Sequence, residues 1–214
     1  MLTELETSDV RVSPQRFSER LGALIDLADS IKISMAHGKL RSSHFQPSGS
    51  SGERLLADFA SARATLVKSV IGEFGPRVRT SLPQPGASEP LEAGAALEAY
   101  QKFYSARQGN LQFKIRHLHE RFRDQVGAVS PALGQLCALD AVLGETMGPY
   151  SKKKFSAVPR LLARRIKHLH SDKSWNDTHQ QVCREMQALL LAETEARLLP
   201  TVGLIEALDE HKDT

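Results

Sequence analysis

The residues best suited to chemistry in this sequence are the lysines and arginines that gather between Tyr150 and Lys173. Eight cationic side chains stand there against one acid, Asp172, so the segment carries a charge of +7 within a chain whose net charge is +3. They are Lys152, Lys153, Lys154, Arg160, Arg164, Arg165, Lys167 and Lys173. Arrays of this kind bind nucleic-acid phosphates with release of counterions, and they also suit acidic protein surfaces.

A helix over residues 155–169 would separate the charged residues of this segment from the apolar ones. At 100° per residue, Arg160, Arg164 and Lys167 lie nearly opposite the apolar side, and Arg165 lies at its edge. The apolar side consists of Phe155, Val158, Leu162, Ile166 and Leu169. We therefore expect an amphipathic helix that buries one face and presents a cationic stripe on the other.

Pro159 separates the lysine cluster from that stripe, because proline favours the start of a helix or a kink. Four interpretations of the segment stay open: a solvated helix face, a contact with DNA, a contact with an acidic partner, and a helix on a membrane surface. The last is the weakest, since the apolar face lacks tryptophan and is needed for the core.

A second candidate surface comprises Leu189, Leu190 and Leu191, within the apolar stretch REMQALLLAETEARLLP. Three consecutive leucines cover more than one side of a helix. The sequence therefore predicts either a central core helix or an interface, and the interface would seat a partner protein or a second copy of the chain.

Motifs for catalysis, metal binding and cofactor binding are missing from the sequence. It contains no P-loop, no G-x-S-x-G and no G-x-G-x-x-G. Both His-Leu-His stretches have i, i+2 spacing, which points the two imidazoles about 200° apart on a helix. Cys137 and Cys183 are too far apart in sequence for a zinc motif and are interpreted as reduced packing residues. We predict a protein without enzymatic activity, catalytic residues, metal or cofactor.

No apolar run approaches the ~18 residues of a membrane-spanning helix. The start, MLTELETSDV, is acidic and lacks the apolar region of a signal peptide. These features predict a cytoplasmic protein that does not insert into the membrane.

Helical periodicity runs through most of the chain and sustained period-2 alternation is absent, which predicts an all-α fold. We expect a bundle of about six to seven helices. The longest is predicted from about Leu91 to Val126 and would span roughly 50 Å. Ser130–Pro131 predicts the start of the next helix and Gly148–Pro149 its end. Pro200 is expected to kink or break the last helix and to leave a short closing helix after it.

Two linker-like stretches suggest how the chain is divided. We expect an N-terminal helical pair over residues 1–75, a proline-rich linker over residues 76–90, and a C-terminal helical bundle over residues 91–214.

Three stretches resemble a proteobacterial family known as domain of unknown function 3348. They are MLTELETSDVRVSPQRFSERLGALIDLADSI, SPALGQLCALDAVLGETMG leading into FSAVPRLLARR, and MQALLLAETEARLLPTVGLIEAL. The resemblance covers most of the chain. Its motifs are helix-packing patterns, so it brings no catalytic residues with it.

The resemblance implies a biological setting. Proteins of this kind look like cytosolic companions of membrane motors that are built from flagellar-stator-like and peptidoglycan-binding subunits. That pairing is similar to the accessory proteins of Zorya-type antiphage defence, particularly its third type. The implied role is a non-enzymatic accessory protein that binds DNA or companion proteins of the same defence system.

Overall fold

The computed structural model describes residues 29–31, 34–35, 38, 52–75, 82, 93–172 and 175–211. In these ranges the regular structure is entirely helical, which confirms the predicted all-α class. The long helices are α3 (Gly52–Gly72), α4 (Ala93–Gly127), α5 (Pro131–Phe155), α6 (Val158–Asp172) and α7 (Trp175–Glu210). The predicted long helix is confirmed as α4, with 35 residues. The first helix of the N-terminal pair predicted over residues 1–75 lies mostly outside the described residues.

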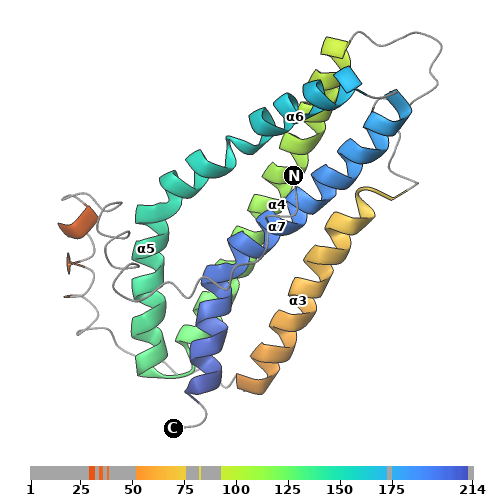
Figure 1. The fold of residues 1–214 in the computed structure, drawn as a ribbon. Helices are drawn as coiled ribbons and strands as arrows, with labels where there is room; N and C mark the ends of the chain where they lie inside the picture. The colour runs from red at the N-terminus through yellow and green to blue at the C-terminus, as the bar shows by residue number, and fades with distance from the viewer. Residues whose placement is uncertain are drawn as a thin grey trace.

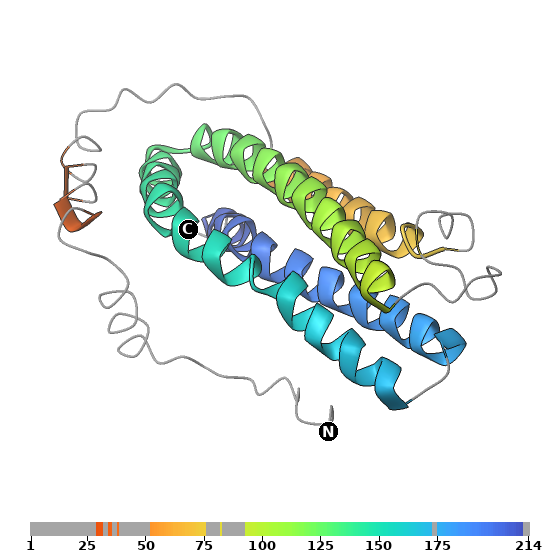
Figure 2. The ribbon, with the colours of Figure 1, turned by 90° about the horizontal axis from the view of Figure 1, so that it is seen from above.

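The bundle is built around two central helices, α4 and α7, which lie side by side and run in the same direction (Figures 1 and 2). Helix α3 packs against both of them on one side and runs the opposite way. Helices α5 and α6 follow one another end to end on the other side and form a second antiparallel rod. The return of the chain through α5 and α6 is what allows α4 and α7 to be parallel.

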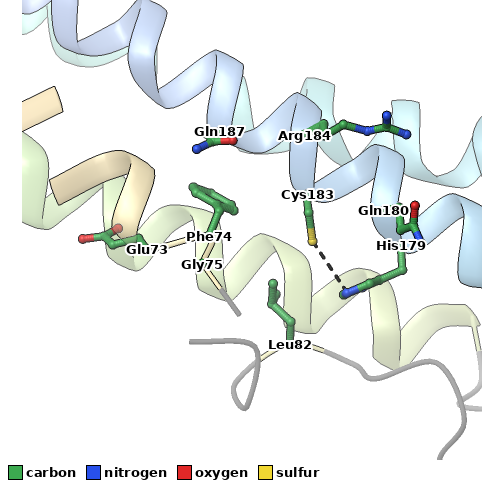
Figure 3. Close-up of a pocket in the computed structure, with 9 residues that line it drawn as sticks. All are labelled: Glu73, Phe74, Gly75, Leu82, His179, Gln180, Cys183, Arg184 and Gln187. Atoms are coloured by element: carbon green, nitrogen blue, oxygen red, sulfur yellow. Dashed lines mark hydrogen bonds between the residues drawn. The ribbon is translucent and has the colours of Figure 1, made fainter. Parts of the chain in front are cut away.

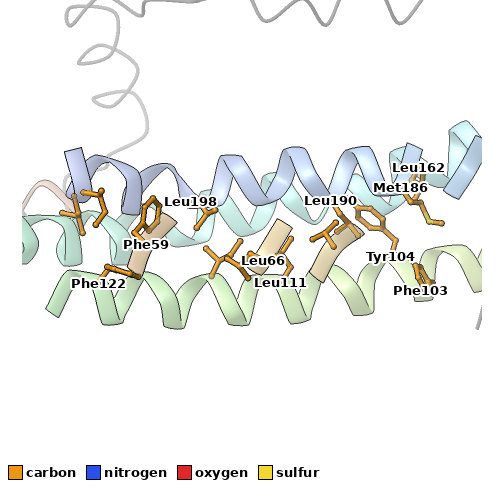
Figure 4. Packing of buried hydrophobic residues seen from close by; sticks show 14 of the residues in the cluster. Phe59, Leu66, Phe103, Tyr104, Leu111, Phe122, Leu162, Met186, Leu190 and Leu198 are labelled. Atoms are coloured by element: carbon orange, nitrogen blue, oxygen red, sulfur yellow. The ribbon is translucent and has the colours of Figure 1, made fainter. Parts of the chain in front are cut away.

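Apolar residues at helical spacing supply one continuous core along the bundle (Figure 4). On α3 the buried residues are Leu55, Phe59, Leu66 and Val70. The Phe59 ring meets the Phe122 ring of α4 edge to face, with centroids 5.5 Å apart and an interplanar angle of 85°. Helix α3 therefore shares its core with the helices that follow residue 90. The division into an N-terminal pair and a C-terminal bundle stays a prediction.

The start of α5 follows from its first two residues. Ser130 has an extended backbone and its Oγ accepts a hydrogen bond from the Leu133 N–H at 3.2 Å. Pro131 occupies the first turn, where its missing N–H costs nothing. This confirms the predicted cap and helix start at Ser130–Pro131.

The expected helix end at Gly148–Pro149 is wrong, and so is the expected separate closing helix after Pro200, whereas a bend in the last helix is observed. Helix α5 continues through Gly148–Pro149 to Phe155, and α7 continues through Pro200 to Glu210 without a separate closing helix. Both prolines are exposed, so water can reach the carbonyl that loses its intrahelical partner. The buried neighbours Leu198 and Thr201 keep α7 packed on either side of Pro200. Figure 1 shows α7 bending along its length rather than breaking.

Candidate functional site

The lysine cluster lies in the last turn of α5. Lys152, Lys153 and Lys154 are all exposed. The helix ends at Ser156, where the Ser156 N–H donates to the Lys152 carbonyl oxygen at 2.9 Å and the Ala157 N–H donates to the Lys154 carbonyl oxygen at 3.2 Å. Positive charge is favourable here, because the carbonyl end of a helix carries partial negative charge. The local sequence therefore ends a helix and gathers cations at the same place.

Two residues separate Phe155 from helix α6, which presents the predicted cationic stripe. Leu162, Ile166 and Leu169 are buried against the core, and Val158 is partly buried against it. On the opposite face lie the exposed side chains of Arg160, Arg164 and Lys167. The burial of α6 thus confirms the predicted division of its faces except at Phe155, which is the last residue of α5; Pro159 lies in the first turn of α6.

The structure separates eight predicted cations into three groups. We call the exposed six the basic surface; it comprises Lys152, Lys153, Lys154, Arg160, Arg164 and Lys167. Among the described residues, none of these six forms an ion pair. Arg165 is half-buried instead and pairs with Glu185 of α7 at 3.1 Å. Lys173 lies outside the described residues.

The three leucines of the second candidate surface point in different directions. Leu190 is 1% exposed and belongs to the core, whereas Leu189 is 38% exposed. Leu191 is partly buried against the core. Of the three, Leu189 is therefore the one that a partner could reach most fully.

A buried carboxylate, that of Glu193, lies near the middle of α7. The Glu193 side chain is 3% exposed and pairs with Arg197 at 2.7 Å. It also accepts hydrogen bonds from Gln108 Nε2 at 2.9 Å and from the Tyr104 hydroxyl at 3.3 Å. Burial, and then the charge of Glu193, raise the pKa of Tyr104 far above its ordinary value of 10, so its hydroxyl stays protonated and able to donate.

This network fixes the junction between α5 and α6. Gln108 Nε2 also donates to the backbone carbonyl of Phe155 at 2.9 Å. The Arg197 guanidinium stacks on the Phe155 ring, with its carbon 3.9 Å from the ring centroid. Phe155 is the last residue of α5, so the core network holds the point at which the two parts of the basic surface meet.

The sequence contains a spacing pattern on α7 that indicates this network. Met186, Leu190, Glu193 and Arg197 follow one another at spacings of 4, 3 and 4, which places two charged residues on the buried stripe of α7. A charged pair on an apolar stripe indicates a buried, paired site rather than a solvated one.

A cavity of about 320 Å³ lies near the start of α7 (Figure 3), and no residue of the basic surface lines it. Its lining residues are Glu73, Phe74, Gly75, Leu82, His179, Gln180, Cys183, Arg184 and Gln187. Cys183 Sγ lies 3.7 Å from His179 Nε2, and His179 Nδ1 lies 2.6 Å from the Tyr100 hydroxyl. Burial, and then the negative charge of a Cys183 thiolate, raise the pKa of Tyr100 far above 10.

A second histidine, His119, bridges three helices. Its Nε2 lies 2.7 Å from Asp140 Oδ2 and its Nδ1 lies 3.0 Å from Thr201 Oγ1. The order Thr, His, Asp resembles a nucleophile with its base, but Thr201 is 0% exposed and no substrate can reach it. The His119 cluster therefore serves to hold α4, α5 and α7 together.

The described part of the chain contains no group of three or more His, Cys, Asp or Glu side chains placed to hold a metal ion. None of its helices is long and apolar enough to cross a membrane.

Comparison with known proteins gives a match at the level of the family. A family model described as "Protein of unknown function (DUF3348)" matches residues 1–210. No curated protein and no solved structure matches the chain.

Proposed function

The chain belongs to the DUF3348 family, and from that premise we propose that it is a non-enzymatic helical accessory protein that binds DNA through the basic surface. The observation that carries the proposal is a set of six exposed cations without ion-pair partners among the described residues. The sequence has no Asp or Glu between Thr146 and Ser171 to weaken their field. Unpaired surface cations are the groups that replace counterions along a phosphate backbone.

Rigid placement supports the same proposal. The two parts of the basic surface belong to separate helices, and their junction is held to the core through Phe155. A fixed array loses less conformational freedom on binding than cations on a free loop. All six side chains can contact phosphates, so we propose contact with the DNA backbone and no defined sequence.

The wider setting in the proposal is the one that the family resemblance implies. The protein would act as the cytoplasmic accessory subunit of a Zorya-like antiphage defence system, beside a proton-driven membrane motor. Finding stator-like motor genes next to the gene for this chain would support the setting, and a gene neighbourhood without them would count against it.

Charge reversal at Arg160 and Arg164 tests the DNA contact. Six phosphate contacts predict that log K falls with log salt concentration with a slope of about −5. The R160E/R164E variant should bind a short DNA duplex at least about tenfold more weakly at low salt, with a slope smaller by about 2. Fluorescence anisotropy at about 50 and 200 mM salt measures both quantities.

A matched control keeps the change in net charge the same. Arg54 and Lys68 are exposed on α3 and form no ion pair among the described residues. The R54E/K68E variant should therefore bind DNA nearly as well as the wild type. Equal losses in the two variants, or binding without a salt slope, would refute the basic surface as the DNA contact.

A second candidate function is that of an adaptor that docks a companion protein or a second copy of the chain. The observation that favours it is a group of exposed apolar residues on α7, comprising Ala188, Leu189, Ala192, Ala196 and Leu199. Leu199 is 65% exposed, which is unusual for leucine in the middle of a helix.

If the protein is an adaptor, the L189E/L199E variant should lose a partner but keep its affinity for DNA. Light scattering should give a monomer mass for the variant and a larger mass for the wild type, alone or with the products of neighbouring genes. A wild-type chain that stays monomeric and captures no companion would refute this second candidate.

A further inference from the structure

We propose that Cys183 is a histidine-activated thiol that forms a mixed disulfide with a small amino-acid-derived or peptide disulfide bound in the cavity at the start of α7. The inference is independent of DNA binding, because it concerns a different part of the fold. It gives the protein a modification site in place of the inert packing cysteine that the sequence suggested.

The geometry supplies a nucleophile, a proton acceptor and an orienting group. His179 is buried, with its Nε2 3.7 Å from the Cys183 sulfur and its Nδ1 2.6 Å from the Tyr100 hydroxyl (Figure 3). Cys183 and His179 are one helical turn apart on α7, so the backbone keeps the two groups together. A thiolate, rather than a thiol, is the attacking species, and a neighbouring imidazole that takes up its proton favours it.

The chemistry balances without a further reagent. His179 takes the Cys183 proton on Nε2 while its Nδ1–H donates to the Tyr100 hydroxyl oxygen, and the thiolate attacks one sulfur of the bound disulfide. A new S–S bond forms to Cys183 while the old S–S bond breaks. The leaving thiolate takes the proton from His179, so one small disulfide is consumed and one small thiol is released.

The lining of the cavity indicates the class of reagent. Arg184 offers a positive charge, and Gln180 and Gln187 offer amide donors and acceptors, whereas the Glu73 carboxylate is already paired with Arg107 at 3.2 Å. The arginine and the two amides match the carboxylates and amides of peptide-like molecules. A volume of about 320 Å³ is within the range of small-molecule sites.

The second cysteine cannot compete for the same reagent. Cys137 is 6% exposed, and burial, followed by the charge of Asp140, raises the pKa of its thiol to about 11. It is buried where α4 and α5 meet, beside Gly127, whereas the cavity lies at the start of α7. A thiol in this state is mostly protonated at neutral pH and reacts slowly.

The test uses the native full-length chain and two reagents. Glutathione disulfide should add one glutathione per chain to the wild type and to C137S, and none to C183S, as read by intact mass. The H179N variant keeps an N–H donor for the Tyr100 hydroxyl oxygen but removes the contact with sulfur. It should lower the rate of alkylation by iodoacetamide at pH 7 about tenfold and move the rise of that rate to higher pH.

A third variant separates recognition from thiol reactivity. R184A should react with iodoacetamide at the wild-type rate but with glutathione disulfide several-fold more slowly.

If H179N does not fold, Y100F removes the orienting hydroxyl with less disturbance and should shift the pH profile in the same direction. An unchanged pH profile in the folded variant would overturn the activation by His179. An unchanged glutathione rate in R184A would overturn the recognition by the cavity.

Discussion

Replacing Arg197 with methionine is expected to lower the free energy of unfolding by about 3–5 kcal/mol, because the Glu193 carboxylate is left buried without its counter-charge. The Glu193 side chain is 3% exposed and cannot turn to water while α7 keeps its place in the core. Gln108 and Tyr104 would still donate hydrogen bonds, but neither carries a charge. Denaturant unfolding, followed by circular dichroism, measures the loss.

The matched control for this prediction is Arg63→Met. Arg63 pairs with Glu195 at 2.6 Å, a distance close to that of the buried pair, but its side chain is 49% exposed. An exposed pair of this kind contributes less than about 1 kcal/mol. The double variant E193Q/R197M should recover part of the stability lost in R197M, since it removes the uncompensated charge. If R197M and R63M lose equal stability, the buried network does not depend on charge.

Replacing Phe122 with alanine should cost about 3–5 kcal/mol of unfolding free energy, the amount typical of a buried aromatic side chain. Phe122 is 0% exposed, and its ring meets the Phe59 ring at 5.5 Å. The substitution would open a cavity between α3 and α4 and remove the edge-to-face contact. Thermal unfolding monitored at the helical signal would show the loss as a lower midpoint.

Phe113 provides the comparison on the same helix. It is 54% exposed, so F113A should change the free energy of unfolding by less than about 1 kcal/mol. A small effect of F122A would mean that α3 separates from α4 at little cost. The contact between α3 and the rest of the bundle would then be peripheral rather than part of one core.

Periodicity was enough to predict the helical class, the length of α4 and the faces of α6. Leu162, Ile166 and Leu169 repeat at helical spacing, and burial follows that repeat directly. The cap at Ser130 was also predictable, since its chemistry depends only on the four residues around it.

Local sequence preferences did not predict that the helices continue through Pro149 and Pro200. A proline removes one hydrogen bond, and whether the helix survives depends on packing in the neighbouring turns. Around Pro200 the buried residues Leu198 and Thr201 supply that packing, and the proline itself faces solvent. Local propensity records the cost of the proline but not the tertiary contacts that offset it.

Sites formed by residues far apart in the sequence could not be predicted from the sequence, for a related reason. Tyr100 and His179 are 79 positions apart, and Tyr104 and Glu193 are 89 apart. Only the parallel packing of α4 on α7 brings them together. Cys183 and His179 have a visible i, i+4 relation, but the cavity beside them requires Phe74 and Leu82 from elsewhere in the chain.

The central position of α7 also has a consequence for synthesis of the chain. Translation produces α3, α4, α5 and α6 before α7, yet α7 contacts all four and supplies their shared core. Arg63 of α3 is synthesised well before its ion-pair partner, Glu195, which lies 132 positions further on. The apolar faces of four helices are therefore made before the helix that covers them, and they are open to chaperones and to wrong partners until residues near 208 have left the ribosome.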